Sequence, residues 1–218
     1  MSDYAHIIHR PQQLRPMTES KGDPFSDLPK GHYGAILADP PWAFPKWSGL
    51  AVPARTKEQP YQYMTMEDIA ALPVSEVAAR DCVLLCWVTW PMLLDCIKCI
   101  EAWGFTYKTC GFAWIKADNT QPSFFYEELK TEMKLGYWTR SNSEVCLLAT
   151  RGKPKRVSAG VRQGIVAPAR EHSRKPDGVH DAIQRLVTGP YLELFARAPR
   201  KGWDVWGNQT GKFKEAAE

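Results

Sequence analysis

The chain has 218 residues, of which 44% are hydrophobic and 24% charged, with a formal net charge of +4. This composition is typical of one globular domain with a large core, and no apolar run approaches the roughly eighteen residues of a membrane-spanning helix. The N-terminus lacks the basic-then-apolar order of a secretory signal, so we expect a cytoplasmic protein. Six cysteines in a chain of this size do not indicate a disulfide framework, and we expect reduced thiols and no metal site.

The first buried strand is predicted from the continuous apolar run Tyr33 to Ala38. Such a run is typical of a strand that is covered on both faces, as in a parallel sheet. Residues 1–26 are polar and contain prolines, which indicates an irregular lead-in. We therefore expect one folded domain over residues 27–211 and a short C-terminal tail over 212–218.

Strands and helices alternate along the rest of this domain. Further strands are predicted at 82–88, 107–116, 143–150, 191–197 and 203–209, and helices at 65–73, 90–105 and 176–189. The order strand, helix, strand over residues 82–116 is the signature of a βαβ unit. The fold class is therefore predicted to be α/β, with three layers built around a mostly parallel sheet.

Two long segments, 43–62 and 117–142, have no regular pattern, and loops of this length in a compact domain are more often functional than idle. A third segment, 151–175, is strongly basic and holds the single acid Glu171. Its cations are Arg151, Lys153, Lys155, Arg156, Arg162, Arg170, Arg174 and Lys175. Charge alone favours a solvated loop here over a contact for an anionic polymer.

Common enzyme motifs are missing from the sequence. The first strand is not followed by Gly-x-Gly-x-x-Gly, and there is no phosphate-binding Gly-x-x-x-x-Gly-Lys-Ser/Thr. The chain also lacks Gly-x-Ser-x-Gly and His-Glu-x-x-His. These absences remove support for the usual dehydrogenase, nucleotide triphosphatase and hydrolase interpretations.

The first strand ends in Asp39-Pro40-Pro41-Trp42, at the edge where α/β sheets bind ligands. Two consecutive prolines stiffen the turn, so the Asp39 carboxylate and the Pro40 carbonyl are expected as fixed, outward-facing acceptors. Two acceptors suit an amino group, and Trp42 offers a flat face for an unstacked base. Because accepting both hydrogens makes a delocalised amine more nucleophilic, the motif favours methylation of a base. The alternative is an ordinary strand-ending turn.

The chain resembles a known family through segments that occur in a fixed order over about residues 27–209. They read "ILADPPW", "YQYMTMEDIAALPV", "VLLCWVTWP", "WGFTYKTCGFAWIK", "SNSEVCLLATRGKP", "SRKPDGVHDAIQRL", "YLELFAR" and "WGNQ". They are similar to the MT-A70-like S-adenosylmethionine-dependent N6-adenine methyltransferases, related to the catalytic subunit of the eukaryotic mRNA adenosine methyltransferase. The short chain resembles the compact prokaryotic and phage members. The resemblance implies a Rossmann-like methyltransferase fold in permuted (beta-class) motif order.

The resemblance also implies roles for individual residues. Asp39 and Pro40, with Pro41 and Trp42, would bind the target amine and shape the base pocket. The implied S-adenosylmethionine-binding residues are Asp27, Leu28, Asp39, Arg151, Glu193, Arg197, Asn208 and Gln209. Arg151 stands where the family commonly has lysine, and Arg retains the charge but changes the geometry. The sequence Ala198-Pro199-Arg200 departs from the histidine and asparagine of eukaryotic relatives, and Arg200 is a candidate substitute.

Substrate contacts complete the implied site. Tyr63 matches a substrate-loop tyrosine, and the basic segment would hold nucleic-acid phosphates without specifying sequence. The substrate-binding candidates are Tyr63, Trp42, Lys153, Lys155, Arg156, Arg174 and Lys175. Some residues implied by the resemblance also have a simpler structural explanation: Glu193 as a paired structural carboxylate, Asn208 and Gln209 as a strand-ending turn, and Tyr63 as loop packing.

The prediction is an enzyme that transfers a methyl group from S-adenosylmethionine to the N6 amine of adenine, without a metal. The expected partner is nucleic acid, with DNA favoured over RNA, and not a membrane; a homodimer is the candidate oligomer. Two alternatives stay open. One is a non-catalytic nucleic-acid-binding subunit, and the other is the same chemistry on cytosine N4 or on a protein amide.

Overall fold

A computed structural model describes residues 22–43, 63–117, 138–171 and 174–213. Most of the two long loops predicted at 43–62 and 117–142 lies outside these residues. The elements follow in the order β1 (Tyr33–Ala38), α1 (Met66–Ala70), α2 (Val74–Val77), β2 (Ala78–Val88), the 3₁₀ helix η2 (Trp90–Met92), α3 (Leu93–Ala102), β3 (Thr106–Ala117), β4 (Ser143–Arg151), β5 (Gly164–Pro168), α4 (Gly178–Leu186), β6 (Tyr191–Leu194) and β7 (Trp203–Trp206). The α/β class predicted from the sequence is confirmed.

The described strands form one sheet in the order β5-β3-β4-β2-β1-β6-β7. β1 runs parallel to β2 on one side and to β6 on the other, and β6 pairs in parallel with β7. β4 is antiparallel to both of its neighbours, β2 and β3, while β3 and β5 are parallel. The chain leaves β1 for β2 and later returns to the other side of β1 as β6, so the carboxyl end of β1 lies at a topological switch point.

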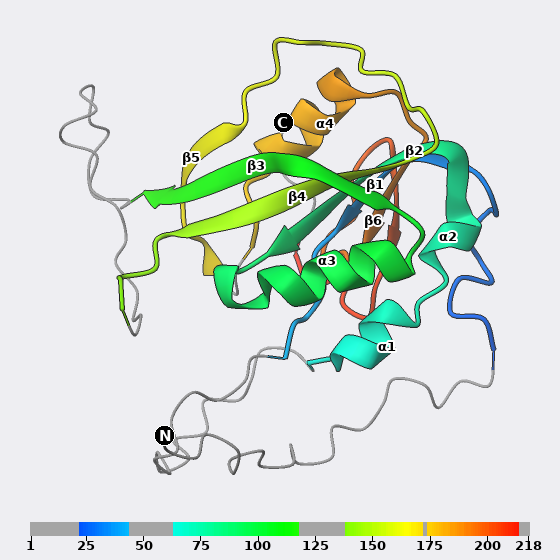
Figure 1. The fold of residues 1–218 in the computed structure, drawn as a ribbon, viewed down its shortest axis with the longest axis horizontal. Helices are drawn as coiled ribbons and strands as arrows, with labels where there is room; N and C mark the ends of the chain where they lie inside the picture. The colour runs from blue at the N-terminus through cyan, green and yellow to red at the C-terminus, as the bar shows by residue number, and fades with distance from the viewer. Residues whose placement is uncertain (1–21, 44–62, 118–137, 172–173, 214–218) are drawn as a thin grey trace, which may run out of the picture.

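Helices cover the two faces of the sheet unequally (Figure 1). One apolar cluster joins α1 and α3 to the sheet through Ile69, Ile100 and Leu84, and the other joins α4 through Ile183 and Leu85. Consecutive residues of β1 and β2 alternate between the two clusters, because side chains point to opposite faces at every step. This double burial explains why β1 and residues 82–88 of β2 read as continuous apolar runs.

Local signals set the ends of two helices. The Oγ1 of Thr65 accepts a hydrogen bond from the backbone N–H of Asp68 at 3.1 Å, which caps α1. Gly104 follows α3 with φ at +80°, the left-handed conformation in which glycine commonly ends a helix.

The structure also differs from the sequence-based expectation. The strand, helix, strand unit β2-α3-β3 is present, but β4 is inserted between its two strands. The strand β5 lies inside the segment expected to be a basic loop, and α2 was not predicted. β6 and β7 end at Leu194 and Trp206, so Arg197, Asn208 and Gln209 follow the strands. Whether the methyltransferase motifs are in permuted order stays a prediction.

Two further expectations concern the membrane and the cysteines. Within the described ranges, no helix combines the length and apolarity needed to cross a bilayer. All six cysteines are free thiols, and five are buried. The described residues contain no cluster of three or more metal-ligating side chains.

Candidate active site

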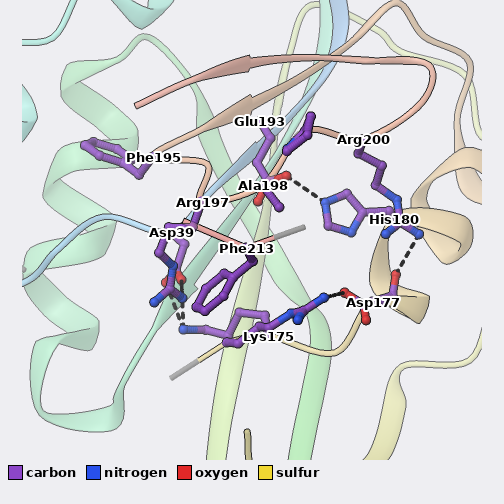
Figure 2. A pocket seen from close by; sticks show the side chains of 12 residues that line it. Asp39, Lys175, Asp177, His180, Glu193, Phe195, Arg197, Ala198, Arg200 and Phe213 are labelled. Atoms are coloured by element: carbon purple, nitrogen blue, oxygen red, sulfur yellow. Dashed lines mark hydrogen bonds and ion pairs between the residues drawn. The ribbon is translucent and has the colours of Figure 1, made fainter. Parts of the chain in front are cut away.

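A pocket opens at the carboxyl ends of β1 and β6, beside the first turn of α4 (Figure 2). Charged side chains of both signs and two phenylalanines line it. The lining residues are Asp39, Arg174, Lys175, Asp177, His180, Glu193, Phe195, Arg197, Ala198, Pro199, Arg200 and Phe213. The switch point of the sheet therefore carries a mixed-charge pocket.

Asp39 is held by two cations that come from distant parts of the chain. The ammonium of Lys175 lies 2.9 Å from Oδ1 and 3.0 Å from Oδ2 of Asp39, and Arg197 approaches Oδ2 at 3.4 Å. β1 delivers the carboxylate, the segment before α4 delivers Lys175, and the turn after β6 delivers Arg197. Arg197 also lies over the ring of Phe213, 5.7 Å from its centroid.

Behind Lys175 lies a second, more deeply buried carboxylate. Glu144 of β4 contacts Lys175 at 3.2 Å and forms an ion pair with Lys116 of β3. Lys116 and Glu144 are only 7% and 6% exposed. Burial alone would raise the pKa of Glu144, but Lys175 and Lys116 outweigh it and hold that pKa below its usual value. Burial alone would lower the pKa of Lys175, but Asp39 and Glu144 hold it above its usual value.

In the turn after β1, the Pro40 carbonyl, one of the two predicted acceptors, already accepts one hydrogen bond. The carbonyl of Pro40 accepts a hydrogen bond from the backbone N–H of Trp42 at 2.9 Å, which leaves one lone pair. The indole of Trp42 is 4% exposed and packs in the core, where its Nε1 donates to the carbonyl of Trp87 at 3.0 Å. In this structure the Trp42 indole packs in the core beneath the turn and is not exposed for stacking on a base.

The carboxyl end of β6 supplies the opposite wall of the pocket. The Oε2 of Glu193 lies 2.8 Å from Nε2 of His180. Phe195 follows at the end of the strand with φ at +62°, a left-handed conformation that is uncommon for a side chain of this size. Its ring meets Trp206 edge-on at 5.5 Å, and the chain then turns toward Arg197.

Several predicted cofactor residues lie close to this wall without lining the pocket. Gly207, just before Asn208 and Gln209, is packed against the backbone of Phe195 and Ala196. The segment with Asp27 and Leu28 is anchored by Phe25, whose ring meets the indole of Trp206 edge-on at 4.9 Å.

Tyr63 is brought beside the turn that follows β1. Its neighbour Met64 pairs with Trp42 in a parallel bridge and donates its backbone N–H to the carbonyl of Pro41 at 3.1 Å.

Four predicted residues lie elsewhere. Arg151 pairs with Cys82 near the amino end of β2, four residues before the level of Ala38, which is about 13 Å along a strand. Its guanidinium donates to the carbonyl of Ser75. Lys153, Lys155 and Arg156 follow Arg151 on the side of the sheet where β1 and β2 begin, because they continue from the carboxyl end of the antiparallel β4. The predicted cofactor contact of Arg151 does not fit this geometry, whereas Arg174 and Lys175 do line the pocket.

The structure adds residues that the sequence interpretation does not identify. Glu144 and Lys116 carry a usable signal, because an acid and a base that stand directly beside buried apolar strand residues require each other as partners. His180, Phe195 and Phe213 carry none, since their place at the pocket depends on packing between distant segments.

Comparisons with known proteins relate the chain to one family. The MT-A70 family model matches residues 33–209. The chain is 30% identical over 200 residues to the type II methyltransferase M.MunI of Mycoplasma sp., covering 84% of this chain and 80% of that protein. It is 30% identical to the N(6)-adenosine-methyltransferase MT-A70-like protein of Arabidopsis thaliana and 28% to the human N(6)-adenosine-methyltransferase catalytic subunit METTL3. Each of these two matches covers 82% of this chain but only 24% and 28% of the relative.

Proposed function

The chain belongs to the MT-A70 family and is an adenine-N6 methyltransferase, and from that premise we propose that it transfers the methyl group of S-adenosylmethionine to adenine in DNA. The single observation that carries the assignment to this site is Asp39, which stands at the switch point of the sheet on the rim of a mixed-charge pocket. Ligands of α/β sheets bind at this place.

The donor set of the pocket fits S-adenosylmethionine, which carries a carboxylate, an ammonium group, sugar hydroxyls and an aromatic base. Lys175 and Arg197 are cations that suit the carboxylate, and Glu193 is an acceptor that suits hydroxyls. Phe195 and Phe213 supply aromatic surface. When bound, this group supplies an electrophilic methyl carbon on a sulfonium leaving group. Lys175 thus takes the role that the sequence interpretation gives to Arg151.

Asp39 and Pro40 would receive the target amine. The carboxylate of Asp39 and the remaining lone pair of the Pro40 carbonyl accept its two N–H groups, which raises the electron density on nitrogen. The amine attacks in line, so that the N–C bond forms while the C–S bond breaks, and the surplus proton then leaves the nitrogen for solvent. Positioning and electrostatics provide most of the acceleration.

The preference for DNA is supported by the similarity to M.MunI over four-fifths of that protein's length. The similarity to proteins named N(6)-adenosine methyltransferases, of which the chain spans about a quarter, makes RNA the second candidate. For a duplex substrate the adenine must leave the stack to reach Asp39, so single strands or flipped bases are the expected substrates.

The test is incubation with labelled S-adenosylmethionine and matched DNA and RNA oligonucleotides, single- and double-stranded, followed by nucleoside mass spectrometry. We expect N6-methyladenine in DNA, and Asp39→Asn lowers kcat by about a hundredfold or more. Asp95→Asn, which changes an exposed carboxylate on α3, is the matched control. Methylation of cytosine N4, or of RNA alone, would refute the corresponding part of the proposal, and absence of any product would refute all of it.

A further inference from the structure

His180 is placed at the pocket by the first turn of α4. Its Nε2 lies 2.8 Å from Oε2 of Glu193, and the two side chains are 12% and 18% exposed. Figure 2 shows the imidazole pointing at the Glu193 carboxylate from the side opposite Asp39. The contact therefore joins α4 to the carboxyl end of β6 at the wall of the pocket.

The imidazole is fixed in orientation by its neighbours. Its ring meets Trp203 edge-on at 4.9 Å, and Trp203 in turn is stacked on Tyr191 at 4.9 Å. Val179, directly before His180, and Ile183, one turn further along α4, are buried in the apolar cluster on this face of the sheet. Neither the helix nor the ring can move away from Glu193 without disturbing this packing.

The direction of the hydrogen bond follows from the chemistry of the partners. An ionised carboxylate only accepts, so Nε2 carries the hydrogen and donates to Oε2 of Glu193. Within the described residues, Nδ1 of His180 is buried without a hydrogen-bond partner, so Glu193 is the partner that sets the ring's tautomer. His180 thus binds Oε2 of Glu193, and Oε1 is the oxygen that would accept a hydrogen bond from a ligand.

Glu193 requires such support because cations line the same pocket. Arg197 and Arg200 both stand on the turn that follows β6. An unrestrained carboxylate would compete with Asp39 and Asp181 for these guanidinium groups, since a charge-assisted hydrogen bond is stronger than one to a neutral hydroxyl. A donor on the opposite side counteracts this pull.

We propose that His180 is a positioning residue, which holds Glu193 so that this carboxylate accepts hydrogen bonds from the sugar hydroxyls of the methyl donor. This rests on the proposed function and deepens it. His180 itself touches neither the donor nor the reacting atoms. Its contribution is to the affinity for ligands that carry those hydroxyls.

The experiment measures dissociation constants by calorimetry for two probes. One is S-adenosylhomocysteine, and the other is its analogue without the 2′- and 3′-hydroxyls. We expect His180→Phe to weaken binding of S-adenosylhomocysteine by about tenfold and to leave binding of the analogue unchanged. His180→Gln, whose amide N–H reaches to the same depth, should restore affinity to within about threefold of wild type.

A variant on the exposed side of the same helix, Gln184→Ala, serves as the control for folding, with thermal midpoints measured for every protein. Equal weakening of both probes by His180→Phe, or no weakening of either, overturns the positioning role while the proposed function stands. A wild-type protein that binds neither probe overturns the proposed function itself, and the inference with it.

Discussion

Glu144 shows how much depends on single charges in this sheet. It is buried between Lys116 on β3 and Lys175 beside the pocket, and both cations reach its carboxylate. An ion pair taken out of water gains little over an apolar pair, but losing one partner leaves the other as an uncompensated buried charge. Here the loss of the Glu144 charge would leave Lys116 as an uncompensated buried charge, while Lys175 would keep its contact with Asp39.

We therefore expect Glu144→Gln to lower the free energy of unfolding by about 3 kcal/mol. The matched control is Asp95→Asn, which breaks the exposed pair between Asp95 and Lys98 and should change it by less than about 0.5 kcal/mol. Urea unfolding followed by tryptophan fluorescence measures both. Equal effects of the two variants would show that the buried pair is not special.

For single residues, the sequence predicts which side chains lie at the pocket better than it predicts which side chains they contact. Asp39, Glu193 and Arg197 are expected at the site and lie at the pocket. Lys175 is expected as a phosphate contact, yet it lies on Asp39, while Arg151 lies on the side of the sheet where β1 and β2 begin. The local sequence does not show whether a strand runs parallel or antiparallel to its neighbours. Because β4 is antiparallel, its carboxyl end places Arg151 away from the carboxyl ends of β1 and β6.

Among the elements, β4 decides most about the shape of the sheet. Its antiparallel course returns the chain to the amino ends of β1 and β2, where Gly152 makes the next bend with φ at +66°. A Cβ at Gly152 would lie 2.2 Å from Oδ1 of Asp81 and 2.3 Å from the carbonyl oxygen of Arg80. Both the conformation and the close approach require glycine.

Gly152→Ala is expected to destabilise the protein by more than about 1 kcal/mol, because the folded backbone cannot accept the added Cβ. Gly164→Ala is the control, since a Cβ at this strand position meets no atom within 4 Å and φ is not positive there. That variant should be neutral or slightly stabilising. Midpoints of urea unfolding compare the two, and a neutral Gly152→Ala would contradict the strain argument.

The elements themselves are largely predictable, since burial on both faces produces continuous apolar runs in β1 and over residues 82–88 of β2. The insertion of β4 between β2 and β3 is not, because the pairing of strands is a long-range choice that periodicity does not encode. β5 is also not predicted. It is only five residues long and none of them is fully buried, so its sequence lacks the long apolar run that marks β1.

For the whole molecule, buried ionisable groups set the pH range of stability. The lowered pKa of Glu144 contributes stability above its usual value of 4.5, and this is lost as pH falls through the lowered value. Burial raises the pKa of the Cys82 and Cys99 thiols from 9.0 to about 12. Those thiols ionise first in the unfolded chain, so stability declines as pH rises above 9.0.

The free energy of unfolding is therefore expected to be nearly constant between about pH 5 and about pH 9 and to fall on both sides. Urea titrations at pH 3, 5, 7, 9 and 10.5 test this. Cys82→Ala should reduce the alkaline decline specifically, because it removes one of the responsible thiols. Equal stability at pH 3 and pH 7 would contradict the role given to Glu144.

A tethered amine already contacts one of the two acceptors that the substrate amine is proposed to use, the carboxylate of Asp39. The ammonium of Lys175 lies within 3.0 Å of both oxygens of Asp39, at an effective concentration fixed by the fold. In thermodynamic terms, the lysine is an internal competitor, and an anion that draws it away relieves the competition. If the donor's carboxylate draws Lys175 away as proposed, its binding and the binding of the amine would be coupled with positive sign, and by linkage each ligand would raise the affinity for the other by the same factor.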